Sequence, residues 1–171
     1  LNTLQVKTLL TNQIDLMTSN QIAAIETRDF IQLTTLNFQA LDSVQIGAFT
    51  TAQVFKLGSS AFAGIDSQDF VGFSTAQVSA LTTAVFSDFG SASVRGLDSA
   101  QFGALKTKTV NILSSKQVSQ IDTNDIIGFN TKQLVAINTL GMYGLTSDQI
   151  AQIESSDFAA FKNTQVAAIQ S

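Results

Sequence analysis

The stretch S-T-A-Q-V-S-A-L at residues 74–81 decides the fold of this 171-residue chain, because its pattern repeats end to end over residues 2–169 without an insertion or a deletion. The array holds 21 octads, and we number the positions of each octad one to eight, with Ser74 at position one. Position two is Ser or Thr in 20 octads, and positions five and eight are apolar in all 21. Position four is Gln in 11 octads, and position seven is Ala or Gly in 13. The octad is therefore the structural unit of the chain.

Positions one and four of the octad carry the signals of a helix start. Position one is Ser, Thr, Asp, Asn or Gly in 16 octads, and these residues accept hydrogen bonds from the free N–H groups of a first helical turn. A Gln three residues later bonds back to the cap in a capping box, while position eight of the preceding octad pairs with position five as a hydrophobic staple. The octad therefore predicts a short capped helix.

The spacing of the two apolar positions separates helix from strand. Positions five and eight lie three residues apart, so they share one face of a helix, whereas a strand would place them on opposite faces. One continuous helix is disfavoured, because eight residues at 3.6 per turn rotate the apolar face by about 80° per octad. We predict an all-α solenoid of very short capped helices, one per octad. The pattern fixes neither the hand of the superhelix nor the number of octads per turn.

A β-solenoid is the alternative fold, since the chain is rich in Val, Ile, Thr and Phe, which favour strands. The Gln at position four and the Ala at position seven argue against it.

A single octad cannot be stable alone. Burying two apolar side chains contributes about 3 to 6 kcal/mol, while ordering eight residues costs about 12 kcal/mol. Stability must come from neighbouring octads, and we expect small residues at position seven, such as Gly64, Gly72 and Gly128, to let successive elements approach closely. The hydroxyl at position two either bonds the local backbone or belongs to an outward row, and the sequence does not separate the two.

The array is predicted to be a single domain over residues 1–171. Leu1 fits position eight of a preceding octad and Gln170 and Ser171 fit positions one and two of a following one, so we expect a slice of a longer array.

The net charge is −4 and the nine basic residues are dispersed, which disfavours nucleic-acid binding. No window approaches the roughly 18 apolar residues of a membrane span.

The residues that usually carry catalysis are missing. The chain has no His and no Cys, so the common general base, metal ligands and thiolate nucleophile are absent. We predict no enzyme, no catalytic residue, no cofactor site and no assigned metal site.

Four octads carry an acid at both position one and position four. The pairs are Glu26 with Asp29, Asp66 with Asp69, Asp122 with Asp125, and Glu154 with Asp157. Carboxylate oxygens are ligands of Ca²⁺, but acids at a helix start also complement its dipole and cap free N–H groups. We favour the second interpretation, and Ca²⁺ stays the possible ligand.

Apolar residues also occur outside positions five and eight. Twelve of the 13 Phe residues fall at these two positions and are predicted to be core. The others are either a surface for lateral association or a widening of the buried stripe, and they include Ile31, Leu36, Phe55, Val71, Ile127, Val135 and Tyr143.

The units STAQVSAL (74–81), TTAQVFKL (50–57), DSAQFGAL (98–105) and TSDQIAQI (146–153) resemble the T-T-x-Q-V-x-A-L tandem arrays of very large bacterial secreted proteins, often labelled adhesins or haem-utilisation proteins. The resemblance covers the whole chain and implies an extracellular or cell-surface location and a structural role. The haem label has no support here, because Met17, Met142 and Tyr143 are the only conceivable ligands.

The predicted function is a stalk, spacer or filament body of a bacterial extracellular or cell-surface protein. Its expected partners are neighbouring repeats or copies of the same array, with possible self-association. The alternative is an adhesive binding module that engages glycans, Ca²⁺ or neighbouring copies through its regular surface.

Overall fold

The computed structural model describes residues 1–169, and over these residues the chain forms 21 short helices and no strand. Nineteen are α-helices and two, η1 and η2, are 3-10 helices. Each octad holds one helix, which begins at position two in every octad except that of η2. The predicted all-α solenoid with one helix per octad is confirmed, and the β-solenoid alternative is wrong.

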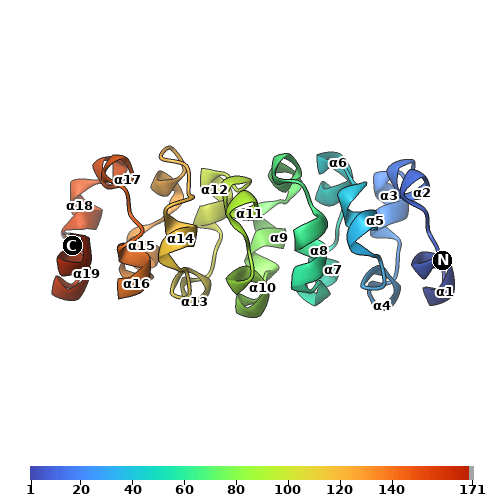
Figure 1. The fold of residues 1–171 in the computed structure, drawn as a ribbon, viewed down its shortest axis with the longest axis horizontal. Helices are drawn as coiled ribbons and strands as arrows, with labels where there is room; N and C mark the ends of the chain where they lie inside the picture. The colour runs from blue at the N-terminus through green and yellow to red at the C-terminus, as the bar shows by residue number, and fades with distance from the viewer. Residues whose placement is uncertain (170–171) are drawn as a thin grey trace. The chain divides into compact units, whose positions relative to one another are not determined.

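The chain divides into two compact units, Leu1–Gly96 and Leu97–Ser171, here called unit 1 and unit 2 (Figure 1). The helices of unit 1 are α1 (Thr3–Lys7), α2 (Thr11–Asp15), α3 (Ser19–Ala23), α4 (Thr27–Phe30), α5 (Thr35–Gln39), α6 (Ser43–Gly47), α7 (Thr51–Lys56), α8 (Ser59–Gly64), η1 (Ser67–Gly72), α9 (Thr75–Ala80), α10 (Thr83–Ser87) and α11 (Ser91–Arg95). The helices of unit 2 are α12 (Ser99–Gly103), α13 (Thr107–Val110), α14 (Ser115–Val118), η2 (Ile126–Gly128), α15 (Thr131–Ala136), α16 (Thr139–Met142), α17 (Ser147–Gln152), α18 (Ser155–Phe158) and α19 (Asn163–Ile169).

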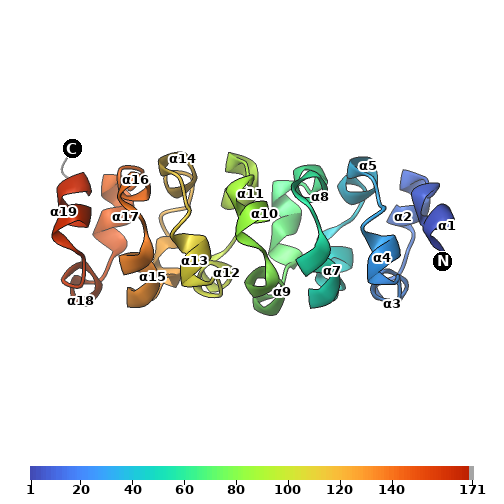
Figure 2. The ribbon, with the colours of Figure 1, turned by 90° about the horizontal axis from the view of Figure 1, so that it is seen from below.

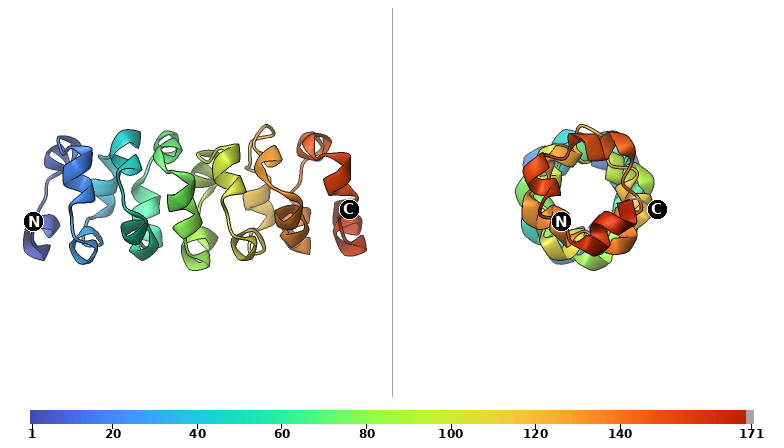
Figure 3. Two further views of the ribbon diagram at one scale, coloured as in Figure 1. Left: turned by 180° about the vertical axis from the view of Figure 1, so that it is seen from behind. Right: turned by 90° about the vertical axis from the view of Figure 1, so that its left-hand side faces the viewer.

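Within each unit the chain winds so that helices three octads apart pack together. In unit 1, α5 packs on α8 and α6 on η1, and the first pair lies side by side in Figures 1 and 2. In unit 2, α12 packs on η2 and α16 on α19. The last helices of unit 2 follow one another around a common axis, as the end-on view of Figure 3 shows. A helix therefore packs against the helix that lies three octads, or 24 residues, earlier in the chain.

The core of each unit consists of the apolar side chains at positions five and eight. From Val6 to Met142 every position-five side chain is at most 2 % exposed. Eleven of the twelve Phe residues predicted to be core are buried, and Phe158 is half-buried. Several ring pairs of unit 1 pack edge to face, as in Phe30 and Phe49, whose centroids lie 4.9 Å apart. This geometry is favourable for aromatic pairs.

Small residues at position seven lie where successive turns approach most closely. A Cβ atom at Gly64 would overlap the carbonyl oxygen of Thr35, and one at Gly72 would overlap that of Ser43. Gly128 stands in the same relation to Ser99. Each oxygen belongs to position two, three octads earlier. The predicted role of these glycines is confirmed.

The apolar residues outside positions five and eight lie mainly on the surface. Of the seven residues named in the sequence analysis, six are exposed by 44 to 63 %, namely Ile31, Leu36, Phe55, Val71, Ile127 and Tyr143. Val135 is half-buried. For the six exposed residues, the interpretation as a widened buried stripe is therefore wrong. Among the described residues, no helix has both the length and the apolar character needed to cross a membrane.

Candidate functional site

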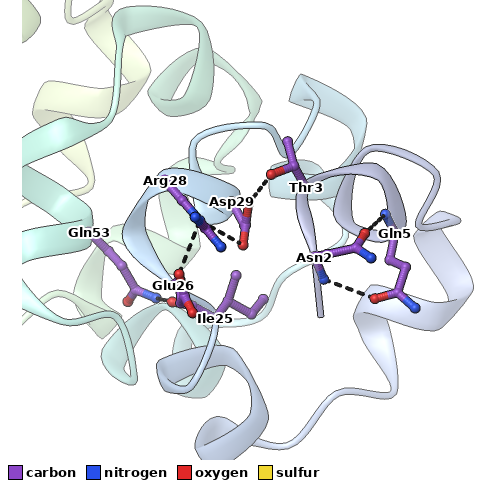
Figure 4. A network of polar contacts seen from close by, with 8 residues as sticks. All are labelled: Asn2, Thr3, Gln5, Ile25, Glu26, Arg28, Asp29 and Gln53. Atoms are coloured by element: carbon purple, nitrogen blue, oxygen red, sulfur yellow. Dashed lines mark hydrogen bonds and ion pairs between the residues drawn. The ribbon is translucent and has the colours of Figure 1, made fainter.

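The capping boxes predicted from positions one and four are present. In the first octad, the Asn2 N–H donates to the Gln5 Oε1 over 2.9 Å, and the Gln5 N–H donates to the Asn2 Oδ1 over 3.0 Å (Figure 4). Both bonds also form in nine further octads, which contain Gln21, Asn37, Gln45, Gln53, Gln77, Gln101, Gln117, Gln133 and Gln149 at position four. One motif thus starts about half of the helices.

The position-four Gln also makes a second contact, which the sequence analysis missed. Its side-chain amide N–H group donates to the carbonyl oxygens of positions five and eight, four octads earlier, and we call this contact an amide rung. Gln53 Nε2, for example, lies 3.2 Å from the Ile22 oxygen and 2.8 Å from the Ile25 oxygen, and Figure 4 shows the second of these bonds. One side chain therefore caps its own helix and ties it to an earlier turn.

Amide rungs form in both units with nearly constant geometry. Their donor-to-acceptor distances are 2.6 to 3.2 Å, at Gln45, Gln53, Gln77, Gln133, Gln149 and Gln165. These six side chains are at most 4 % exposed. Gln5, Gln13 and Gln21, which have no residue 28 positions before them in this sequence, are exposed. Since helices pack three octads apart and rungs reach four, one turn takes between three and four octads.

A signal for the rung was present in the sequence. A capping box accepts Glu as readily as Gln, yet position four is Gln in 11 octads and never Glu. Only the amide combines an acceptor for the cap with donors for the carbonyls. The absence of Glu therefore indicates that the side chain must also donate.

The position-four acids of the four acid pairs make a different inter-turn contact, which we call an acid rung. The Thr3 hydroxyl donates to the Asp29 Oδ1, and the Thr131 hydroxyl donates to the Asp157 Oδ1 over 2.5 Å. In the other two pairs the backbone N–H groups of Ser43 and Ser99 act on the Asp69 and Asp125 carboxylates and lower the pKa of each. In all four the group that acts on the acid belongs to position two, 26 residues earlier. Part of the position-two row therefore holds turns together.

The position-one acids are exposed and do not cap their helices as expected. No side-chain capping bond forms at Glu26, Asp66 or Glu154, and Asp122 is exposed as well. In the first pair, Arg28 Nε lies 3.1 Å from a Glu26 oxygen and 3.6 Å from the buried Asp29 Oδ2 (Figure 4). Among residues 1–169, no group of three or more acids is arranged to hold a metal ion.

Two acid rungs lie beside further carboxylates. Burial raises the pKa of Asp69, the charges of Asp66 and Asp42 add to this effect, and the Ser43 N–H opposes it. Burial likewise raises the pKa of Asp125, opposed by the Ser99 N–H and reinforced by Asp122 and Asp98. Each unit therefore contains one acid whose ionised form is disfavoured by the fold.

One octad of unit 1 has a hollow at the position that an amide rung occupies in other octads. Octad 12, residues 90–97, has Gly90 at position one and Ser93 at position four, and α11 has no side-chain cap. A hollow of about 570 Å³ opens beside it. Its lining includes Phe62, Ala63 and Ile65, which precede Ser93 by the 31, 30 and 28 residues that separate a Gln from its acceptors. This hollow is the candidate binding site of the described chain.

The comparison with known families agrees with a repeat-containing protein. The ALTTAQ repeat matches residues 22–59, a stretch that includes T-T-A-Q at residues 50–53 and the rung of Gln53. None of the curated proteins matches the chain.

Proposed function

We propose that this chain is a structural segment, acting as a stalk, spacer or filament body of a bacterial extracellular or cell-surface protein, and that it performs no catalysis. The observation that carries the proposal is the amide rung, which recurs with the same spacing in both units. Each rung buries an amide whose donors and acceptor are satisfied. A partial opening of the turn would break these hydrogen bonds and would therefore cost free energy. Repetition would then set length while the rungs set stiffness.

The local rules of the array make length adjustable. The rungs and the close approaches at position seven join an octad to the third or fourth octad before it, so removal of whole octads leaves each remaining octad with equivalent partners for these contacts. In a repeat array, stability is approximately a sum over units and their neighbours. Length would change in steps without a change of fold, as a spacer requires.

The test is a series of deletions within unit 2, measured by small-angle X-ray scattering and circular dichroism. Removal of residues 130–137, then 130–145, then 130–153 is expected to shorten the largest dimension by equal steps and to leave the helical signal per residue unchanged. Removal of residues 130–133 is the matched control, because half an octad exchanges the apolar and polar positions and is expected to lower helicity. Unequal steps, or a tolerated half-octad deletion, would contradict the spacer. Antibody labelling of intact source cells tests the location.

A second candidate is adhesion between copies through the exposed apolar side chains. Leu36, Phe55 and Val71 in unit 1 are each more than half exposed, and large apolar surface side chains favour association. Sedimentation of the chain against its Phe55→Ser variant tests this candidate. Association that is weakened by the substitution would support it, and a monomer at all concentrations would exclude it.

A further inference from the structure

We propose that the hollow beside Ser93 is a binding site for a primary ammonium group, such as a lysine side chain of a partner or a small amine. This inference goes beyond the structural role and does not depend on it. It rests on a set of carbonyl groups that no side-chain amide reaches, on a hydroxyl that lines the hollow and on the charge of the lining.

The acceptors are the three carbonyl groups that receive an N–H donor elsewhere in the chain. Gln45 Nε2 lies within 3.1 Å of the carbonyl oxygens 31, 30 and 28 residues before it, and Gln77 and Gln133 repeat this pattern. In octad 12 the equivalent carbonyls belong to Phe62, Ala63 and Ile65, which line the hollow. In octad 12, therefore, no side chain supplies the nitrogen donor that the Gln Nε2 atom supplies in other octads.

Ser93 is the residue that leaves this place open. Its side chain is too short to span the distance covered by a Gln, it is only 9 % exposed, and it lines the hollow. No hydrogen bond joins its hydroxyl to the rest of the described chain, so it offers a further polar contact to a ligand. Two other octads of unit 1 have a position-four side chain that can form neither rung, but there the side chains are the apolar Ala61 and Val85, and both are buried.

The charge of the lining favours a cation over a neutral donor. Asp66 and Asp88 both line the hollow, and no Lys or Arg does. The Ser59 hydroxyl donates to the Asp88 Oδ2 over 2.5 Å and so orients that carboxylate. An ammonium group has three N–H donors and no acceptor, which matches a lining of carbonyl, hydroxyl and carboxylate oxygens.

The experiment is a titration of the ¹⁵N-labelled 171-residue chain with n-propylammonium, followed by NMR. Saturable shifts are expected at the amides of Ala63, Gly90 and Ser93. Trimethyl-n-propylammonium, which has the same charge without an N–H donor, is expected to bind at least about fivefold more weakly, since it loses hydrogen bonds to charged or buried acceptors. Equal binding of the two cations would overturn the proposal, as would the absence of saturable shifts with both.

Three variants, one of them a control, locate the site. Ser93→Gln supplies an internal amide to the three carbonyls and is expected to abolish the shifts, whereas Ser60→Gln, an exposed position outside the lining, is expected to leave them unchanged. Asp66→Asn is expected to weaken binding at least about threefold, because it removes one of two carboxylates. Undiminished binding by Ser93→Gln, with a wild-type circular dichroism spectrum, would overturn the assignment. So would shifts of the same amides by Ca²⁺ with no response to the amine, which would make the hollow a metal site.

Discussion

Octad 7 (residues 50–57) and octad 12 (residues 90–97) share one backbone plan and differ in how they join an earlier turn. Both form a short helix at positions two to six or seven, α7 in one and α11 in the other, and both bury their position-five valine, Val54 and Val94. Octad 7 has Thr50 and Gln53, which make a capping box and an amide rung. Octad 12 has glycine and serine at these positions, and a hollow in place of the rung.

The difference separates two tasks that the octad pattern combines. The apolar residues at positions five and eight are sufficient for a helix to form and to join the core, since α11 does so without a side-chain cap. The residues at positions one and four decide whether the contact between turns is closed by the chain or left open to solvent. Function can therefore vary along the array without a change of fold.

The largest expected effect comes from breaking the rung of octad 7. Gln53→Glu keeps the acceptor of the capping box but places a carboxylate against the carbonyls of Ile22 and Ile25. We expect a loss of about 3 to 5 kcal/mol in the free energy of unfolding at pH 7, because a buried charge is left without a partner. Urea denaturation followed by circular dichroism measures it, and acidification is expected to recover part of the loss because a protonated Glu donates.

Gln13→Glu is the matched control for this prediction. Gln13 makes the same bond to its cap, in which the Leu10 N–H donates to Oε1 over 2.9 Å, but its side chain is exposed and has no rung. The expected change is within about 0.5 kcal/mol. Equal losses at Gln13 and Gln53 would show that the cap, and not the rung, carries the stability.

The next effect concerns the close approach of turns at position seven. Gly72→Ala places a Cβ against the carbonyl of Ser43 and is expected to destabilise unit 1 by about 1 to 3 kcal/mol, the usual range for overpacking. Gly90→Ala in octad 12 is its counterpart, since a Cβ there has no atom within 4 Å, and it is expected to cost less than about 1 kcal/mol, the preference of a helix N-cap for Gly over Ala. Thermal unfolding of both variants checks the contrast, and a tolerated Gly72→Ala would refute the close approach.

Octad 12 can also be made to resemble octad 7. The double variant Gly90→Ser and Ser93→Gln supplies a cap and a rung, and we expect it to raise the free energy of unfolding by about 1 to 2 kcal/mol. Gly90→Ser alone is expected to give about half of this gain or less. Urea denaturation measures both. No gain from the double variant, in a chain with unchanged circular dichroism, would mean that the hollow does not correspond to a missing rung.

The sequence predicted those features that depend on residues close together in the chain. A cap, a Gln three residues later and two apolar residues three apart are local signals, and they correctly predicted one short helix per octad. The rungs join residues 26 to 31 positions apart, and the number of octads per turn must be known before such partners can be paired. The rungs of Gln53 and Asp29 were therefore missed for one physical reason, although the absence of Glu at position four had already indicated a donor.

The smallest expected effect concerns the acid rung of Asp69, where burial and the nearby Asp66 and Asp42 raise the pKa. Since the ionised form is disfavoured in the fold, this carboxyl stabilises the protein when protonated, and that contribution declines as the pH rises from the unfolded pKa through the raised folded pKa. Asp69→Asn keeps an acceptor for the Ser43 N–H and removes the charge, so we expect it to be more stable than the wild type at pH 7 and to lose this advantage near pH 3. Urea denaturation at both values measures the difference, with Asp88→Asn as the control at a carboxylate outside the acid rungs. An Asp69→Asn variant less stable than the wild type at pH 7 would mean that the contact with Ser43 requires the carboxylate charge. The acid rung would then stabilise the protein through an inter-turn contact that an Asn side chain cannot replace.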